Sequence, residues 1–338
     1  MVHGGGEGRH MAKKRVGIIG SPLERHCIYL AREIENQGAQ AVVLNTAPNI
    51  PFPLTLEAGL EEVGPDPGSG ERGRMVPQSR EEYAGIDLWE IGAFFLRVFF
   101  LPTPAFDPDV EALKEGGYVE YVAQRERYAA WLSWLKWLSE TDRVLVNPVD
   151  TLLIHFAKPF QIERLRRAGI PVPRTLVTGD GETVRAFAAE REVVYKPVAG
   201  GALCRRLTRE DLKPERLERL AGAPVLFQEY IPGEDIRVFV LGDRVIGAFR
   251  IEGEGLDYRG GAHRVEAVDI DKDIARASTA ACRALGLLFS GVDVKRRPDG
   301  SWVILECNPA PMFEGFDTVA SPTIVSQVAR YLIEAARG

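Results

Sequence analysis

The sequence GVDV at residues 291–294 and the sequence LECNPAP at residues 305–311 decide the fold of the second half of this chain. A Pro-Asp-Gly turn separates them, which predicts two strands of a hairpin. Each run places oxygen-bearing side chains among apolar residues: Asp293 in the first, and Glu306 and Asn308 in the second. Glu306 and Asn308 are two residues apart and therefore share one face of their strand. Because buried acids without a cation are costly and Mg²⁺ prefers oxygen ligands, the hairpin predicts a magnesium site, with a structural polar network as the alternative.

Two further motifs precede this hairpin. VYKPV at 194–198 ends an apolar strand in a Lys, and the glycines at 200–201 would let backbone N–H groups approach the anion that the Lys contacts. LFQEYIPG at 226–233 is an apolar strand that turns polar and breaks at Pro-Gly, which suits a hinge whose backbone binds an adenine edge. Alone, each motif has a plain alternative: a solvated strand-end Lys in the first, and surface acids at Glu229 and Glu234 in the second.

Five segments of the second half occur in one order: VYKPV, FQEYIPGEDIRVFV, DYRGGAHR, GVDV and ILECNPAPMFEGFD. In this order they resemble the ATP-grasp enzymes, most closely the RimK-type glutamate ligases, and more loosely the ATP-grasp ligases that modify ribosomally made peptides. The resemblance extends from residue 147 to the end of the chain. The predicted helix at Lys158, followed by GIPVPRT, matches the entry to the family's small subdomain.

The resemblance implies an ATP-dependent ligase that activates a carboxylate as an acyl phosphate. This intermediate would then be joined to an amine of an amino acid or peptide, with release of ADP and phosphate. The implied cofactors are ATP and Mg²⁺, with two metal ions expected and Mn²⁺ as an alternative metal. Two other functions stay open: a phosphotransferase of the same fold acting on a small-molecule hydroxyl, and a non-catalytic ATP-binding module. The intact acid and amide set argues against the module, which could lose a metal ligand freely.

The resemblance also assigns roles to individual residues. Two lysines match contacts to the α- and β-phosphates, four hinge residues match the adenine site, and one acid matches the ribose contact. These residues are Lys158, Lys196, Gln228, Glu229, Tyr230, Ile231 and Asp235. The matches to the metal ligands are Asp293, Glu306 and Asn308. The matches to catalytic positions are Arg237 and Arg250, for the acyl phosphate and the tetrahedral adduct, and Arg259, near the γ-phosphate.

Three loops on the phosphate or substrate side bear on specificity. Met312–Asp317 matches a substrate-side loop of the family. Gly200–Arg206 does not reproduce the longer Gly-rich flap that the family carries after its second Lys. Arg259 is followed by two glycines instead of the polar Ser-Asn pair of the glutamate ligases. The resemblance therefore supports the use of ATP better than it supports glutamate as the substrate.

The first half begins with a strand–helix–strand unit. RVGIIG at 15–20 and AVVLN at 41–45 are predicted strands, and a helix is expected from about Pro22 to Asn36, which gives a parallel sheet. The first turn is GIIGSP instead of G-x-G-x-x-G, and the second strand is not followed by an acid. This pattern argues against a dinucleotide site. Residues 47–82, rich in Gly and Pro, are predicted to be a loop.

Two helices complete the prediction. Tyr118–Leu138 is expected to be a long amphipathic helix with Trp131, Trp134 and Trp137 on one stripe, either for core packing or as a substrate platform. Ser321 is expected to cap the final helix.

The predicted fold class combines α/β and α+β architecture: an ATP-grasp fold preceded by an N-terminal parallel α/β domain. The expected parts are a disordered leader or tag at 1–12, an N-terminal substrate-side domain at 13–146, a small ATP-grasp subdomain at 147–224, and a C-terminal ATP-grasp subdomain with the metal site at 225–338.

Composition limits the partners. The chain has 338 residues and a formal net charge of −6, which argues against a general nucleic-acid binder. It has four scattered cysteines without a CxxC pair, which is typical of reduced thiols in a cytoplasmic protein, and no apolar run long enough to span a membrane. The expected partner is therefore a small molecule, amino acid or peptide, and a homo-oligomer stays open. Lys is rare, with nine Lys against 33 Arg, so a Lys within a motif has more weight.

Overall fold

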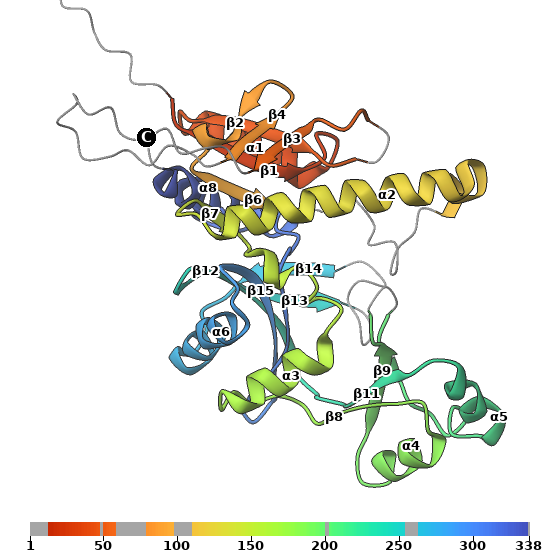
Figure 1. The fold of residues 1–338 in the computed structure, drawn as a ribbon. Helices are drawn as coiled ribbons and strands as arrows, with labels where there is room; N and C mark the ends of the chain where they lie inside the picture. Colours follow the sequence, from red (N-terminus) through yellow and green to blue (C-terminus); the bar gives the residue numbers. More distant parts are fainter. Residues whose placement is uncertain are drawn as a thin grey trace, which may run out of the picture. The chain divides into compact units, whose positions relative to one another are not determined.

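The structure is a computed structural model that describes residues 13–47, 50–58, 79–97, 110–199, 203–253 and 263–336. The chain divides into two compact units (Figure 1). The first unit contains the residues up to Leu145 together with Ala329–Gly338, and the second contains Val146–Val328. The predicted leader at 1–12, the glycines at 200–201 and Arg259 lie outside the described residues.

The main sheet of the first unit has the strand order β2-β1-β6-β7. Strand β1 pairs in parallel with β2 on one side and with β6 on the other, which confirms the predicted parallel sheet. Helix α1 connects β1 to β2 and begins at Arg25, later than predicted, because the Glu24 carboxylate caps it by accepting from the Cys27 N–H at 2.8 Å. The bounds are β1 Arg15–Gly20, α1 Arg25–Asn36, β2 Gln40–Asn45, β6 Ala93–Leu96 and β7 Val144–Val146.

A second, antiparallel sheet of order β3-β4-β5 corrects the prediction of a continuous loop at 47–82. Strand β3 reads LTLEA, which does alternate, whereas β4 and β5, which read SREEY and ID, lack the apolar alternation from which strands are recognised. Polar pairing stabilises them instead: buried Glu81 accepts two hydrogen bonds from Arg143, at 3.0 and 2.9 Å, and one from the Trp134 indole at 2.9 Å. The bounds are β3 Leu54–Ala58, β4 Ser79–Tyr83, β5 Ile86–Asp87 and the 3-10 helix η1 Leu88–Glu90.

Helix α2, Val110–Ser139, carries the predicted tryptophan stripe. Gly117 has φ 60° and ψ −140°, so the helix is interrupted there. Trp131 and Trp134 are buried, and the Trp134 ring lies 5.3 Å from the Phe94 ring of β6. Core packing is therefore the observed role of these two side chains.

The second unit contains a small antiparallel sheet of order β10-β9-β11-β8. Its own core consists of Val184, Val193, Leu217 and Phe227. Strand β11 belongs to this sheet, although it lies beyond the predicted subdomain boundary at 224. The bounds are η2 Val149–Thr151, α3 Lys158–Arg167, β8 Thr175–Thr178, α4 Gly181–Ala188, β9 Val193–Pro197, β10 Arg205–Arg206, α5 Pro214–Leu217, η3 Glu218–Gly222 and β11 Val225–Glu229.

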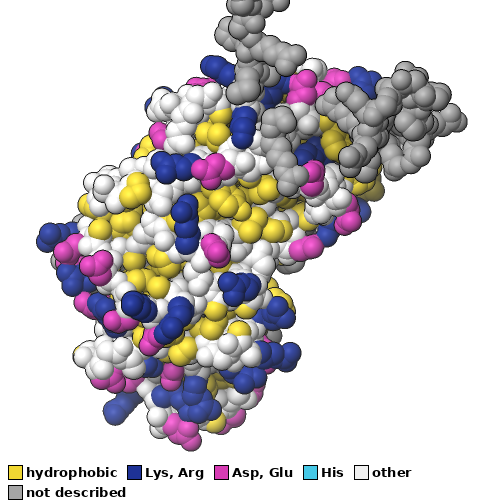
Figure 2. Space-filling view, turned by 90° about the vertical axis from the view of Figure 1, so that its left-hand side faces the viewer, with side chains coloured by type: hydrophobic (Ala, Val, Ile, Leu, Met, Phe, Trp, Pro, Cys, Tyr) yellow, Lys and Arg dark blue, Asp and Glu magenta, His cyan; other side chains and the backbone are white. Residues whose placement is uncertain are grey.

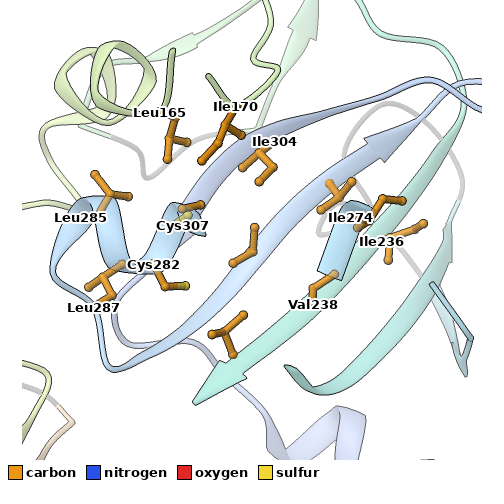
Figure 3. Packing of buried hydrophobic residues seen from close by; sticks show 14 of the residues in the cluster. Leu165, Ile170, Ile236, Val238, Ile274, Cys282, Leu285, Leu287, Ile304 and Cys307 are labelled. Carbon is orange, nitrogen blue, oxygen red and sulfur yellow. The ribbon is translucent and has the colours of Figure 1, made fainter. Parts of the chain in front are cut away.

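A larger antiparallel sheet of order β14-β13-β12-β15-β16 completes the second unit. One of its faces packs against α6 through a core that includes Ile236, Ile274, Ile304, Cys282 and Cys307 (Figure 3). The opposite face carries the residues that alternate with this core, which include the charged Arg237 and Asp293 and the buried rings of Phe239 and Phe249. The bounds are β12 Glu234–Leu241, β13 Arg244–Gly253, β14 His263–Ala267, α6 Lys272–Leu285, β15 Phe289–Arg296, β16 Trp302–Asn308, α7 Glu314–Asp317 and α8 Ile324–Ala335.

The predicted cap of the last helix is wrong. Helix α8 begins at Ile324, and the Asp317 carboxylate accepts from the N–H groups of Ile324 and Val325, at 2.5 and 3.1 Å. Ser321 lies too far ahead of the first turn to cap it. No helix in the described ranges is both long and apolar enough to cross a membrane.

Candidate active site

Two carboxylates meet on the face of the large sheet that is opposite to α6. Asp293 on β15 is in register with Glu306 on β16 and with Arg237 on β12, so the three side chains share this face. Asn308 follows two residues after Glu306, and its Nδ2 donates to Asp293 Oδ2 at 3.2 Å. Arg237 Nε lies 2.6 Å from Asp293 Oδ1. We call Asp293, Glu306 and Asn308 the acid centre.

Two lysines from outside the large sheet reach the acid centre. Lys196 on β9 of the small sheet lies with its Nζ 3.5 Å from Glu306 Oε2. Lys158, the first residue of α3, lies with its Nζ 3.7 Å from the same oxygen and donates to the His155 carbonyl at 3.1 Å. The structure thus brings together both predicted phosphate-binding lysines and the predicted metal ligands.

The two carboxylates differ in their pKa. Burial raises the pKa of Asp293 to about 6; the Arg237 guanidinium opposes this rise and the nearby Glu306 carboxylate adds to it. Burial also acts to raise the pKa of Glu306, but Lys196 and Lys158 outweigh it, so this pKa is lower than the ordinary value. The acid centre therefore contains a stabilised carboxylate, Glu306, and a carboxylate, Asp293, whose negative charge the neighbouring cations do not fully offset.

The donor set fits a hard cation. It offers two carboxylates and an amide on paired strands, and an added positive charge would offset the cost of ionising Asp293. In the described part of the chain, no three His, Cys, Asp or Glu side chains group closely enough to hold a metal. A cation at the acid centre would thus need further oxygens, such as those of a phosphate, to complete its coordination.

Gly291 and Asn147 support this arrangement and were missed in the sequence. A Cβ at Gly291 would lie 2.8 Å from Arg237 Nη1 and 2.9 Å from Pro311 Cβ, so glycine provides the space for the guanidinium. Buried Asn147 accepts from the N–H groups of Leu288 and Phe289, both at 2.8 Å, and donates to the Phe289 carbonyl at 2.7 Å. Its amide also donates to the Pro309 carbonyl, which ties the start of β15 to the loop after β16.

The predicted substrate-side loop is anchored on the same face as Arg237. The Phe316 ring lies 5.1 Å from the Phe239 ring and 5.3 Å from the Phe249 ring, and the Arg237 guanidinium lies 5.9 Å from it. Met312, in contrast, is 68% exposed and available to a ligand. The loop therefore has a fixed aromatic side and an open side.

The predicted adenine hinge consists of the last two residues of β11, Gln228 and Glu229, and the two residues that follow them. The Gln228 amide donates to Thr175 Oγ1 at 2.9 Å, and the N–H groups of Glu229 and Tyr230 donate to backbone carbonyls at 2.9 Å. Within the described residues, the N–H of Ile231 has no hydrogen-bond partner. The Arg206 guanidinium lies over the Tyr230 ring at 3.9 Å. Ile231 is therefore the position at which this hinge offers a backbone donor.

Two predicted residues lie away from the acid centre. Arg250 on β13 is opposite Ile236, so it shares the α6 side of the sheet rather than the side of Arg237. Glu234, Glu252 and Glu266 surround it at 3.3, 3.1 and 2.6 Å. Asp235, the predicted ribose contact, pairs with Lys295 on β15 at 2.7 Å. Sequence spacing could not reveal the side on which Arg250 lies, because that depends on the register of two strands.

Comparison with known protein families gives one match that covers half of the chain. Residues 158–332 match a sequence model of the RimK-like ATP-grasp domain. A probable alpha-L-glutamate ligase 2 from Shewanella amazonensis (strain ATCC BAA-1098 / SB2B) is 36% identical over 116 residues, or 32% of this chain. A probable alpha-L-glutamate ligase 1 from Shewanella sp. (strain MR-4) is 34% identical over the same length. In both comparisons this chain spans 38% of the length of the relative.

Solved structures match over almost the whole chain. The ATP-grasp ligase PsnB, complexed with a phosphomimetic variant of a minimal precursor, Mg and ADP, has a TM-score of 0.80 and 32% identity. The match covers 95% of this chain and 98% of that protein. The macrocyclase MdnC from Microcystis aeruginosa MRC has a TM-score of 0.68 and 20% identity, covering 94% and 99%, which shows the shared fold alone. These matches confirm the predicted fold class, including the parallel sheet in the N-terminal region.

Proposed function

Because this chain belongs to the RimK-like ATP-grasp family, we propose that it uses ATP to activate a carboxylate as an acyl phosphate and joins it to an amine of an amino acid or peptide. ADP and phosphate would be the other products. The arrangement of charges at the acid centre is the observation that carries the proposal. Arg237 lies beside Asp293, and Lys196 of the small sheet and Lys158 of α3 both approach Glu306. Such an arrangement could bind anionic phosphate oxygens and a metal cation and stabilise an oxyanion that develops beside them.

ATP would bind between the hinge and the acid centre. The N–H of Ile231 offers a donor to the adenine edge, Asp235 lies at the start of β12 for the ribose, and the two lysines mark the phosphates. Gln228, Glu229 and Tyr230 shape the hinge through their own hydrogen bonds and through the ring of Tyr230.

Asp293, Glu306 and Asn308 would hold Mg²⁺, two ions in our proposal, with Mn²⁺ as a substitute. The bound metal would neutralise charge on the transferring phosphoryl group. PsnB was solved with Mg and ADP, which supports these cofactors.

Arg237 is the candidate that stabilises the adduct. Its guanidinium is buried, lies beside Asp293 and is confined by Gly291 and Phe316. A fixed donor near a developing oxyanion stabilises the transition state by about 3–4 kcal/mol. Arg250 would reach the site only if strand β13 changed its register, and Arg259 lies outside the described residues, so these two assignments have less support.

A peptide is the substrate that we favour. The PsnB structures contain a minimal precursor or the precursor peptide PsnA2, and this chain shares 32% identity with PsnB over nearly its full length. On the face in Figure 2, Lys and Arg side chains are interspersed with Asp, Glu and hydrophobic side chains, which suits a peptide better than a nucleic acid. Four free cysteines, three of them buried, fit a reducing compartment, and we propose the cytoplasm.

The test is a condensation assay. The protein would be incubated with ATP, Mg²⁺ and a panel of amino acids and peptides encoded near its gene, with ADP release and product mass as the readouts. The proposal expects a product whose mass equals the summed masses of the two joined substrates minus the mass of one water molecule. A product heavier by one phosphoryl group would instead identify a phosphotransferase, and ADP binding without any turnover would identify an ATP-binding module.

A further inference from the structure

Lys295 lies on the same face of β15 as Asp293, two residues earlier, but at the hinge end of the strand. Its Nζ donates to Asp235 Oδ2 at 2.7 Å and to the Gly233 carbonyl at 3.1 Å. Its side chain is only 15% exposed. Gly233 lies between β11 of the small sheet and β12 of the large sheet, and Asp235 is the second residue of β12, where the adenosine end of a nucleotide would bind.

The surrounding chain fixes this lysine in place. Gly233 has φ 125°, and a Cβ there would clash with the backbone oxygen of Arg296, so the hinge backbone packs directly on the end of β15. Arg296 in turn donates to Glu234 at 2.7 and 3.0 Å. The ammonium of Lys295 is therefore held in a defined position.

The remaining hydrogen-bonding capacity points to a ligand. An ammonium has three N–H donors, and the described residues account for two of those of Lys295. Among the described residues, the Asp235 carboxylate has one hydrogen bond, from Lys295 to Oδ2, and its Oδ1 has no hydrogen-bond partner. A charged donor and a charged acceptor thus lie side by side, which is the complement of two adjacent hydroxyl groups, one accepting and one donating.

We propose that Lys295 contacts the nucleotide directly and that Lys295 and Asp235 together bind the two ribose hydroxyls. The inference rests on the proposed use of ATP. Lys295 then acts as a specificity residue: it favours ribonucleotides over deoxynucleotides. A methionine or leucine at this position could contact the sugar but could not donate a hydrogen bond to it.

The test compares the affinities of the full-length protein for Mg²⁺ complexes of ADP, 2′-deoxy-ADP and 3′-deoxy-ADP by calorimetry. A hydrogen bond to a charged group corresponds to roughly a tenfold or greater change in affinity, so wild type should prefer ADP over at least one deoxy form by about that factor. Lys295→Met should reduce this preference several-fold. Asp235→Asn should reduce it as well, and it gives a second test if Lys295→Met does not fold. Lys272→Met removes an exposed lysine at the start of α6 and should leave the preference unchanged.

Each outcome decides the inference. A wild-type protein that binds ADP without preference over either deoxy form, or a Lys295→Met variant that keeps the full preference, overturns the role of Lys295 while the use of ATP stands. A wild-type protein that does not bind ADP overturns the proposed function as well. Equal loss of affinity for all three nucleotides in Lys295→Met would show a general charge effect and would also overturn the inference.

Discussion

We expect the change Asp293→Asn to stabilise the unliganded protein at neutral pH while it abolishes turnover. The side chain of Asp293 is largely buried beside Glu306, and its pKa is raised from 3.8 to about 6. An amide has the shape of the protonated carboxyl and carries no charge. The variant therefore avoids the cost of ionising Asp293 in the folded state.

The magnitude follows from the pKa. A rise of about two units corresponds to about 3 kcal/mol, because each unit is worth about 1.4 kcal/mol. Below about pH 4 the carboxyl is protonated in both the folded and the unfolded chain, so it contributes no difference. Between about pH 4 and pH 6 the unfolded chain loses this proton first, and the free energy of unfolding of wild type falls as pH rises. Above about pH 6 the whole cost is present.

Urea unfolding of wild type and Asp293→Asn at several pH values would measure this difference. The gap should open between about pH 4 and pH 6 and then stay constant. Asp243→Asn, which removes the same charge from an exposed residue in the β12–β13 turn, should show no such gap. If Asp293→Asn is equally stable or less stable than wild type at neutral pH, the reasoning about burial and like charge at the acid centre is refuted.

Three further variants test the surroundings of Asp293. Glu306→Gln should destabilise the protein by roughly 3–5 kcal/mol at neutral pH, because it leaves Lys158 and Lys196 without their carboxylate. Urea unfolding should show this loss, and the difference from wild type should shrink as pH falls and Glu306 becomes protonated. An unchanged midpoint of the urea transition would contradict it. Lys196→Ala should weaken binding of a non-hydrolysable ATP analogue while thermal unfolding stays cooperative; calorimetry would show unchanged affinity if this lysine is only a solvated strand end. Gly291→Ala should lower kcat at least tenfold and cost about 1–3 kcal/mol of stability, because the added methyl group displaces Arg237; turnover at the wild-type rate would mean that Arg237 has room to move without consequence.

Much of the acid centre is predictable from the sequence because local rules determine it. The turn at 298–300 makes β15 and β16 neighbours, so Asp293 and Glu306 are expected in one region of the sheet. Their direct pairing, however, depends on a register shift between Asp293 and Val294, because regular pairing continued from Val294 and Ile304 would place Leu305 opposite Asp293. The strand alternation then puts Asn308 on the same side as Glu306. Lys158 and Lys196, which we propose bind phosphate, are less determined by local rules, since each lies on a different element; their approach to Glu306 is a tertiary result.

The features that the sequence does not predict depend on tertiary pairing rather than on local rules. The resemblance gives Arg250 the same catalytic role as Arg237, but the pairing of β12 with β13 places the two side chains on opposite faces. Strand β4 is polar, and the buried ion pair between its Glu81 and Arg143 joins residues 62 positions apart. No local pattern reports such a pair. Lys295 did carry a signal: it is one of nine lysines and lies two residues after Asp293 on the same strand face.

The contacts of Glu306 with the two lysines have a consequence for the thermodynamics of nucleotide binding. A free lysine side chain loses up to about 1.5–2 kcal/mol of rotamer entropy when it is fixed in place. Here Lys158 and Lys196 are both oriented toward one oxygen of Glu306, so in the proposed complex with ATP that loss would belong to folding rather than to association. In the proposed complex, Glu306 would contact the metal ion while the two lysines contact the phosphate groups. The Glu306 carboxylate thus orients both lysines for the phosphate groups that we propose they bind.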